Sequence, residues 1–240
     1  MKIPSTVRDP KILAQRRAEL VEVATTLFLE RGYHKTSIRD IARACPFNLA
    51  ALYMYVGSKE DILYLVAQHL VNEIVKELKP ATLTDRDPAE ALRFAFQTYC
   101  RVVHRFSRHI RLLYREIESL PRPARDPILT SVESLVVIFE ELLDRAVACG
   151  EVRKIDTRLI AVNFIVAAHM WALHGRLLRS QMNLDKFVEE QSAALFDGVL
   201  ANVPGRRVAP IDGKRAAAPA PATRRGTGGN IAKRAARTKT

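Results

Sequence analysis

Residues 36–60 read TSIRDIARACPFNLAALYMYVGSKE, and this stretch decides the fold. Ser37 followed three residues later by Asp40 has the form of a helix-capping box, so a short helix begins there. Pro46 lies in a turn, and Asn48 is a favourable N-cap for a second short helix, which runs to about Tyr55. Two short helices joined by a tight turn form a helix-turn-helix, whose second helix enters the major groove of DNA. The stretch therefore predicts a DNA-reading module.

Longer helices are predicted on both sides of this motif. On its N-terminal side, apolar residues recur at helical spacing over residues 10–31, and Gly32 is suited to end that helix. On its C-terminal side, Ser58 begins a second capping box and predicts a helix to about Leu78, which Pro80 ends. Together with the motif, these helices form the framework of a small helical domain. The residues before the first helix are expected to be a mobile arm.

The rest of the chain shows helical periodicity and no alternating strand pattern. Cap and turn signals divide it into helices at about 88–106, 108–119, 127–149, 157–179 and 184–201. The fold class predicted is all-α, with nine helices. The apolar run 159–173 is shorter than the roughly 20 residues that span a bilayer, so it predicts a buried or dimer-facing helix and no membrane partner.

The formal net charge of +12 is concentrated at the C-terminal end. From Gly205 onward there are ten basic residues and one acidic residue, in a segment rich in Ala, Pro and Gly. Such a segment cannot bury enough apolar surface to offset its chain entropy, so residues 204–240 are expected to be a disordered basic tail. The tail would contact DNA phosphates without reading sequence, or serve only for solubility.

Enzymatic chemistry has little support in the sequence. No P-loop, GxSxG, HExxH or paired CxxC motif is present. His104 and His109 are five residues apart, as are His169 and His174. This spacing places the two side chains of each pair about 140° apart around a helix, so neither pair is arranged to bind a metal ion. We therefore expect no catalytic residue, no metal site and no cofactor. Three widely spaced cysteines and the lack of an apolar signal segment indicate a cytoplasmic protein.

The motif and its flanks resemble the N-terminal domain of TetR-family transcriptional regulators. The shared pattern, LF-x-E-x-GY-x-x-TS, then IA, a turn and LY-x-Y-x-x-SKE, covers about residues 15–66. The chain departs from the pattern at Pro46 and Ala50, where the family commonly has glycine, so a relative's operator sequence cannot be transferred. The resemblance implies an all-α plan with a three-helix helix-turn-helix DNA-binding domain and N-terminal arm at 1–57, a six-helix ligand-binding and dimerisation domain at 58–203, and the basic tail at 204–240.

The resemblance also implies which residues contact DNA. Asn48 has the strongest hydrogen-bonding capacity on the reading helix, Tyr55 is expected to contact phosphate, and Tyr53 is expected mainly to pack. Lys59 is expected to meet a phosphate, because a cation at a helix N-terminus is otherwise unfavourable. Ser37 contacts phosphate or only caps its helix, and both readings stay open. The predicted DNA-binding residues are Thr36, Ser37, Arg39, Asn48, Leu49, Ala50, Ala51, Tyr53, Met54, Tyr55 and Lys59.

A short reading helix binds DNA weakly alone, so a homodimer on a palindromic double-stranded operator is expected. The resemblance places the dimer interface on the last two helices. Their apolar residues are Leu159, Val162, Ile165, Val166 and Trp171 on one helix, and Phe187, Ala194, Leu195 and Leu200 on the other.

The resemblance further implies a small, often apolar effector held among helices five to eight. The segment SKEDILYLV at 58–66 and its surroundings resemble members that respond to acyl-CoA thioesters. The candidate ligand-binding residues are Tyr99, His104, Tyr114, Asn163, His169, Trp171 and His174, although a single histidine or aromatic residue there is more often part of a packed core than a ligand contact.

These expectations combine into a ligand-responsive regulator, most simply a repressor. An effector that favours one spacing of the two reading heads would release the operator, with the helix after Lys59 as the mechanical link. The competing interpretation is a non-specific architectural nucleic-acid-binding protein dominated by the basic tail. A regulator prefers one site over random DNA by about a thousandfold or more, whereas an architectural protein does not.

Overall fold

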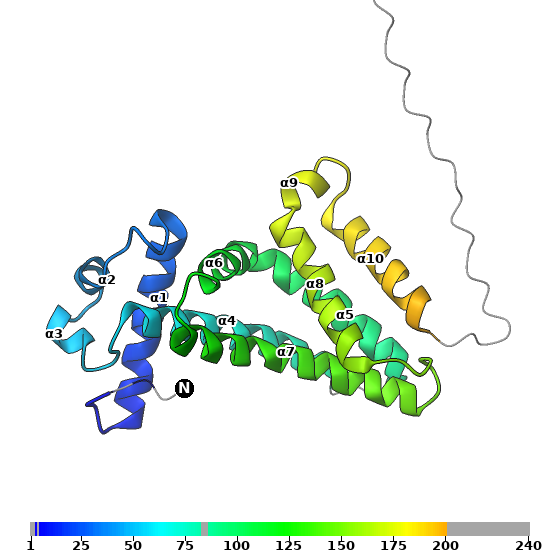
Figure 1. The fold of residues 1–240 in the computed structure, drawn as a ribbon, viewed down its shortest axis with the longest axis horizontal. Helices are drawn as coiled ribbons and strands as arrows, with labels where there is room; N and C mark the ends of the chain where they lie inside the picture. Colours follow the sequence, from blue (N-terminus) through cyan, green and yellow to red (C-terminus); the bar gives the residue numbers. More distant parts are fainter. Residues whose placement is uncertain (1–2, 4, 83–85, 201–240) are drawn as a thin grey trace, which may run out of the picture. The chain divides into compact units, whose positions relative to one another are not determined.

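The computed structural model describes residues 3, 5–82 and 86–200 (Figure 1). The tail at 204–240 lies outside these residues. The described part of the chain is helical, with one isolated bridge between Val152 and Leu200 and no strand. The helices are α1 (Pro10–Arg31), α2 (Ile38–Ala44), α3 (Leu49–Leu52), α4 (Lys59–Thr82), α5 (Pro88–Arg105), α6 (Ser107–Ile117), α7 (Arg122–Ala148), α8 (Thr157–Leu173), α9 (Gly175–Leu178) and α10 (Leu184–Val199). The all-α prediction is confirmed.

The end of α1 and the starts of α2 and α4 lie where the sequence places them. Helix α1 ends at Gly32, whose φ of 90° is a backbone conformation that side chains disfavour. The Ser37 side chain accepts a hydrogen bond from Asp40 N, and the Asp40 carboxylate accepts one from Ser37 N, which completes the predicted capping box. Ser58 and Asp61 make the same pair of contacts ahead of α4. Local cap chemistry therefore sets these boundaries.

Two predicted boundaries at prolines are wrong. Helix α4 continues past Pro80 to Thr82. A proline in the last turn removes only one helical hydrogen bond, and the fully buried Ala81 holds that turn against the core. Helix α7 begins at Arg122, earlier than the predicted start at Pro127. Pro123 lies in its first turn, where a missing N–H has no helical partner to lose.

Two other helices are shorter than predicted. Helix α3 spans one turn, because the next residues continue as tighter turns in which Met54 N donates to Ala51 O and Tyr55 N donates to Leu52 O. Helix α8 ends at Leu173, and a separate one-turn helix, α9, follows at Gly175. Glycine is a poor helix former, which accounts for the break. The described chain therefore has ten helices where nine were predicted.

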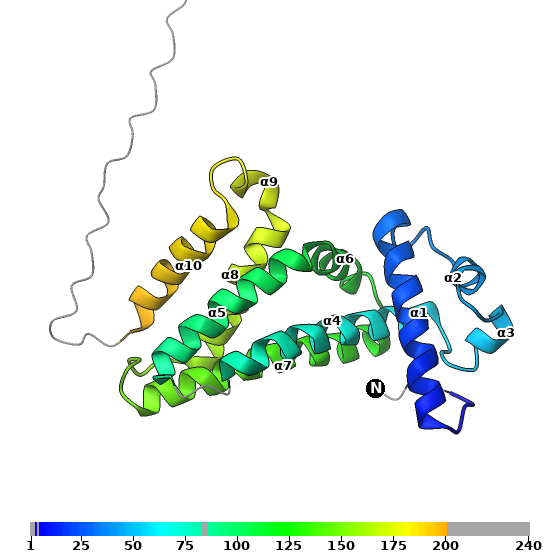
Figure 2. The same cartoon turned by 180° about the vertical axis from the view of Figure 1, so that it is seen from behind.

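Helix α4 connects the N-terminal helices to the rest of the described fold. It packs against α1 at one end and against α5 and α7 along its length, as the two opposite views show (Figures 1 and 2). Helix α8 packs on α5, α6 and α7, and α10 lies against α5. Phe164 of α8 meets Phe96 at 5.2 Å, Phe196 at 5.3 Å and Phe139 at 5.9 Å between ring centroids. One continuous hydrophobic core runs from the N-terminal arm to α10.

Candidate DNA-binding surface and ligand cavity

Helices α2 and α3 are fixed to the core from one side. Ile41 of α2 and Leu52 of α3 are fully buried; α2 packs against α1, and α3 packs against α2. Asn48 is the N-cap of α3, and its Oδ1 accepts a hydrogen bond from Ala51 N at 2.9 Å. The opposite faces of both helices are left to solvent. The sequence-predicted reading helix is therefore rigidly held with its outer face free.

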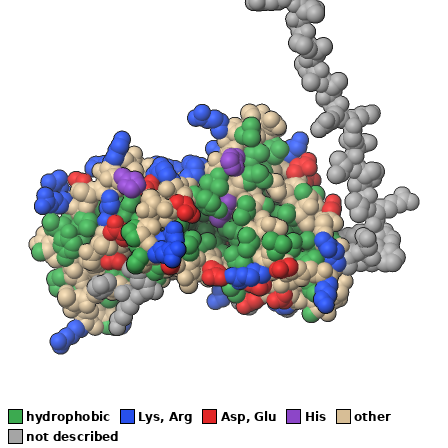
Figure 3. Space-filling model, in the orientation of Figure 1, with side chains coloured by type: hydrophobic (Ala, Val, Ile, Leu, Met, Phe, Trp, Pro, Cys, Tyr) green, Lys and Arg blue, Asp and Glu red, His purple; other side chains and the backbone are tan. Residues whose placement is uncertain are grey.

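The exposed face carries much of the predicted DNA-binding set. Arg39, Asn48 and Ala50 are exposed, and Leu49 and Ala51 are partly exposed. A shallow groove between α2 and α3 is lined by Arg39, Ala42, Arg43, Asn48 and Leu49. Lysine and arginine side chains also project from this end of the molecule in the space-filling view (Figure 3). The two arginines can contact DNA phosphates, and the amide of Asn48 and the side chain of Leu49 can contact base edges.

Two tyrosines have exchanged their expected environments. The prediction that Tyr53 packs in the core is wrong, because its side chain is 51% exposed beside Met54 at 44%. Tyr55, expected to contact phosphate, is only 8% exposed, and its ring packs edge-on against Phe47 at 5.3 Å. The tighter turn after α3 rotates these residues away from the positions a longer α-helix would give them. Tyr53 is thus the tyrosine that is free to meet DNA.

Thr36 is unsuited to the phosphate contact predicted for it. Its side chain is buried, and its hydroxyl donates to Gly32 O at 2.8 Å. This bond closes the loop between α1 and α2 and leaves the hydroxyl proton unavailable to a ligand. Ser37 beside it remains exposed as well as capping α2. The Thr36 hydroxyl is therefore not placed to contact a phosphate, contrary to the prediction. The phosphate contact of Ser37 stays a prediction.

The reasoning for Lys59 is also corrected. Its Nζ donates to Tyr33 O at 3.1 Å and to Thr36 O at 3.2 Å, and it lies 4.2 Å from the centroid of the Tyr33 ring. These partners offset its charge near the N-terminus of α4 without an anion. A lysine ammonium has three donors, so one remains for a phosphate. Lys59 first joins α4 to the α1–α2 loop, and a DNA contact would be additional.

The N-terminal arm contributes contacts that sequence reasoning missed. Ser5 Oγ and Thr6 N both donate to Met54 O, at 2.8 and 3.1 Å. Arg17 of α1 donates to Tyr55 O at 2.8 Å and to Ile3 O at 3.2 Å. The arm is thus fastened beside the turn that follows the reading helix. Backbone carbonyls are the acceptors, so no residue pattern in the sequence could have indicated these bonds.

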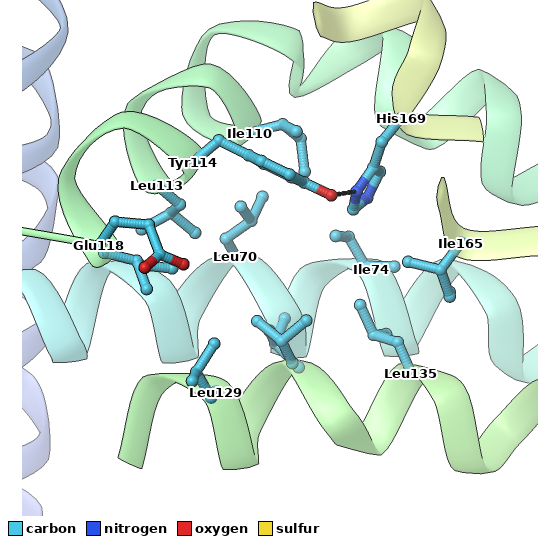
Figure 4. Close-up of a pocket in the computed structure, with 13 residues that line it drawn as sticks. Leu70, Ile74, Ile110, Leu113, Tyr114, Glu118, Leu129, Leu135, Ile165 and His169 are labelled. Atoms are coloured by element: carbon cyan, nitrogen blue, oxygen red, sulfur yellow. Dashed lines mark hydrogen bonds between the residues drawn. The ribbon is translucent and has the colours of Figure 1, made fainter. Parts of the chain in front are cut away.

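An apolar cavity of about 250 Å³ lies within the C-terminal region, among α4, α6, α7 and α8 (Figure 4). Helix α5, which the predicted effector site included, contributes no lining residue. Most of the lining side chains are aliphatic: Leu70, Val71, Ile74, Ile110, Leu113, Ile117, Leu129, Val132, Leu135 and Ile165. The remaining lining residues are Tyr114, Glu118 and His169. Such a lining suits an apolar molecule with few polar atoms.

The polar end of the cavity is a hydrogen-bonded chain of three side chains. His169 Nδ1 lies 2.9 Å from Tyr114 Oη (Figure 4). Its Nε2 lies 2.7 Å from Tyr99 Oη. Burial lowers the pKa of His169 to about 4, so its ring is neutral at physiological pH. Burial also raises the pKa of both tyrosines, which keeps them protonated. Tyr99 is completely buried, whereas Tyr114, which lines the cavity, is 46% exposed.

The structure divides the predicted ligand-binding residues into two groups. Tyr114 and His169 line the cavity, and Tyr99 lies directly behind them. The other four do not reach it. The Trp171 indole donates a hydrogen bond of 2.8 Å to His104 Nδ1, and neither residue lines the cavity. Asn163 and His174 are exposed to solvent. Helical periodicity in α5 and α8 could not separate these four positions from cavity-facing ones, because it cannot distinguish one face of a helix that borders a cavity from another.

The outer face of α8 is unusually apolar. Leu159, Val162 and Val166 are exposed at 57%, 39% and 55%, at helical spacing along one stripe. Apolar surface is visible over this part of the molecule in Figure 3. On α10, Ala194 is exposed and Leu195 is partly exposed. Ile165, Trp171 and Phe187, which the sequence could not assign between the partner and the subunit's own core, are buried in that core.

Helix α6 provides a second connection between the cavity and the DNA-reading end. Its Glu116 is buried, and the carboxylate lies 2.5 Å from Arg115 Nε and 2.9 Å from His34 Nε2 in the α1–α2 loop. Arg108 of the same helix donates to Leu29 O of α1 at 2.9 Å. Tyr114 and Ile117, which line the cavity, lie on the same helix. A displacement of α6 would therefore be felt at both sites.

Among the described residues, no group of three or more His, Cys, Asp or Glu side chains gathers in an arrangement for a metal ion. No helix in that part of the chain is both long enough and apolar enough to cross a membrane.

The chain matches known protein families over much of its length. Residues 20–65 match the family described as bacterial regulatory proteins, tetR family. Residues 85–174 match the C-terminal domain described as tetracyclin repressor-like. The HTH-type transcriptional regulator HbdR of Aromatoleum sp. (strain CIB) is 30% identical over 198 residues, which cover 82% of this chain and 86% of HbdR.

Solved structures share the fold. A transcriptional regulator of the TetR/AcrR family from Thermobifida fusca is 26% identical and superposes with a TM-score of 0.61, over 77% of this chain and 98% of that chain. The regulator FadR from Bacillus subtilis, solved in complex with stearoyl-CoA, is 16% identical with a TM-score of 0.67, over 75% of this chain and 98% of that chain. Because FadR is only 16% identical to this chain, the similarity between the two proteins concerns the fold alone.

Proposed function

The chain belongs to the TetR family of bacterial transcriptional regulators, and we propose that it is a repressor released from its operator by a small apolar effector. It binds a palindromic operator as a homodimer, with one reading helix in each half-site. An acyl-CoA thioester is the leading candidate effector. The observation that carries the proposal is the apolar cavity bounded by α4, because α4 begins directly behind the DNA-reading helix.

The coupling follows from the two helices shared by both regions. Helix α4 lines the cavity through Leu70 and Ile74 and contacts the α1–α2 loop through Lys59. Helix α6 lines it through Tyr114 and contacts the same loop through Glu116. An occupant that separates α4 from α6 displaces that loop. A ligand that binds the displaced state more tightly shifts the population away from the operator-binding state.

The acyl-CoA candidate rests on the character of the cavity and on a relative of the same fold. Aliphatic side chains from four helices surround a space that suits a hydrocarbon chain. FadR of Bacillus subtilis was solved with stearoyl-CoA. The exposed apolar stripe of α8 supports the dimer, since a soluble protein seldom leaves such a row uncovered.

The first test selects the operator. Full-length protein and a variant ending at Pro204 are each used to select fragments from random double-stranded DNA at about 150 mM salt. Both are expected to recover one palindrome, preferred about a thousandfold or more over unrelated DNA. Selection of no preferred sequence, with binding that depends on the tail, would contradict the proposal and favour an architectural protein.

The second test fills the cavity. Val132→Trp places an indole among the lining residues on α7, whereas Val137→Trp on the same helix adds one at an exposed position outside the lining. Operator binding is followed while acyl-CoA compounds of several chain lengths are added. Both variants should bind operator, and only Val132→Trp should resist release. Equal release of the two variants would show that the effector binds elsewhere.

The dimer has its own test. Val166→Asp places a carboxylate in the apolar stripe of each α8, where a twofold dimer brings like charges together. Sedimentation should detect monomers, and operator affinity should fall steeply. Leu177→Asp introduces the same charge at an exposed residue of α9 and serves as the control. A dimeric Val166→Asp variant would exclude this face as the interface.

A further inference from the structure

The direction of the hydrogen bonds around His169 determines what the cavity offers a ligand. A neutral imidazole has one N–H donor and one acceptor nitrogen. His169 has a tyrosine hydroxyl at each nitrogen, with Tyr99 at Nε2 and Tyr114 at Nδ1. One tyrosine must therefore donate to the ring while the other accepts from it. The choice between them fixes which hydroxyl keeps a free proton.

Burial decides between the two arrangements. Tyr99 Oη has His169 as its only hydrogen-bond partner among the described residues, and its side chain is completely buried. If Nε2 carried the imidazole proton, the Tyr99 hydroxyl proton would have no acceptor in the core. Leaving a buried donor unpaired costs about 1–3 kcal/mol. Tyr99 therefore donates to Nε2, and the imidazole proton resides on Nδ1.

The direction of the hydrogen bond between His169 and Tyr114 then follows. Nδ1–H donates to Tyr114 Oη at 2.9 Å, so the Tyr114 hydroxyl proton is not used by His169. Tyr114 lines the cavity and is partly exposed, and its hydroxyl lies at the polar end of that space (Figure 4). A chain of polarised hydrogen bonds strengthens the final donor. The cavity thus presents one oriented O–H group to an occupant.

We propose that Tyr114 is the specificity-determining donor of this cavity, oriented by His169 and Tyr99, and that the effector carries an uncharged carbonyl oxygen which accepts its proton. This proposal rests on the proposed function, in which the cavity holds the effector. Ester, thioester, amide and ketone oxygens fit this requirement. A free carboxylate fits less well, because Glu118 brings a negative charge to the same cavity.

The tautomer is tested without any ligand. Nitrogen-15 NMR of ring-labelled histidine, with His169→Gln used to assign the signal, should show the Nδ1–H form in the wild-type protein. Tyr114→Phe should keep that form, because Tyr99 still donates to Nε2. Tyr99→Phe should lose the strong preference for it. An Nε2–H ring in the wild-type protein would overturn the proposal.

The donor is tested with paired probes that differ at one carbonyl. Octanoyl-CoA is compared with the octyl thioether of CoA, and 2-nonanone is compared with nonane, by competition for a fluorescent apolar probe. The wild-type protein should prefer the carbonyl compound of each pair by about tenfold, as expected for a hydrogen bond in a buried site. In Tyr114→Phe the preference should fall to near equality.

The outcomes separate the two proposals. An unchanged preference in Tyr114→Phe would overturn the role of the hydroxyl while leaving the effector cavity in place. Failure of all four compounds to bind the wild-type protein would contradict the effector cavity itself. The NMR result would then still decide the direction of the hydrogen bonds. Leu113→Ala, which alters the aliphatic lining only, should weaken both members of each pair equally.

Discussion

The DNA-reading region and the cavity region organise their polar side chains in opposite ways. In the reading region the hydrogen bonds that begin α2 and α3 are local, since Ser37 pairs with Asp40 and Asn48 pairs with Ala51. In the cavity region they join distant parts of the chain, with Tyr99 and Tyr114 bonded to His169 across separations of 70 and 55 residues. Local chemistry builds a surface for a large external partner. Long-range chemistry builds an interior site that exists only once the whole domain has folded.

The largest expected effect tests whether one core unites the two regions. Phe164→Ala removes a fully buried ring from the aromatic cluster and should lower the free energy of unfolding by about 3–5 kcal/mol. Leu177→Ala, at an exposed position, is the control and should change it by less than about 0.5 kcal/mol. Denaturant unfolding followed by circular dichroism measures both. If the DNA-reading helices unfold in a separate transition that Phe164→Ala leaves unchanged, the shared core does not couple the regions.

The second prediction concerns acid and the buried histidine. Burial lowers the pKa of His169 to about 4, against an ordinary value near 6.5. As pH falls below about 6.5, the unfolded chain takes up this proton before the folded protein does, so stability is lost between about pH 6.5 and 4. The loss from this group is on the order of 3 kcal/mol. It should disappear in His169→Phe, as measured by denaturant unfolding at a series of pH values. An unaltered pH dependence in that variant would show that other groups control acid stability.

The same contrast between local and long-range contacts explains which features of the fold and of the candidate sites could be predicted from the sequence. Residues that cap helices in the reading region were identified correctly because a cap needs only a residue type at a fixed spacing. The Tyr53 and Tyr55 environments were exchanged, since one tighter turn after α3 rotates both side chains. His169 was proposed from its residue type, but nothing in α8 alone separates it from Asn163 or His174. Which face of a helix borders a cavity depends on how the neighbouring helices pack against it. The residue pattern of that helix alone does not determine those contacts.

The third prediction uses the two tyrosines to sharpen the description of the reading surface. Tyr53→Phe removes an exposed hydroxyl and should weaken operator binding by about tenfold, with two such contacts in a dimer. Tyr55→Phe alters a buried ring position and should leave operator affinity within about twofold. Fluorescence anisotropy with the selected operator measures both. The reverse order of effects would restore the original assignment of Tyr55 as the phosphate contact.

The smallest expected effect tests whether the local caps are independent of the cavity. Ser37→Ala removes the side-chain acceptor at the start of α2 and should lower the free energy of unfolding by about 1 kcal/mol. Ser58→Ala removes the matching contact ahead of α4, at a similar cost. The two variants should differ in effector response, because α4 lines the cavity and α2 does not. Release by effector should be normal in Ser37→Ala and altered in Ser58→Ala. If both respond like the wild-type protein, the first turn of α4 does not transmit the signal, and the contact of α6 with the α1–α2 loop becomes the route to the operator.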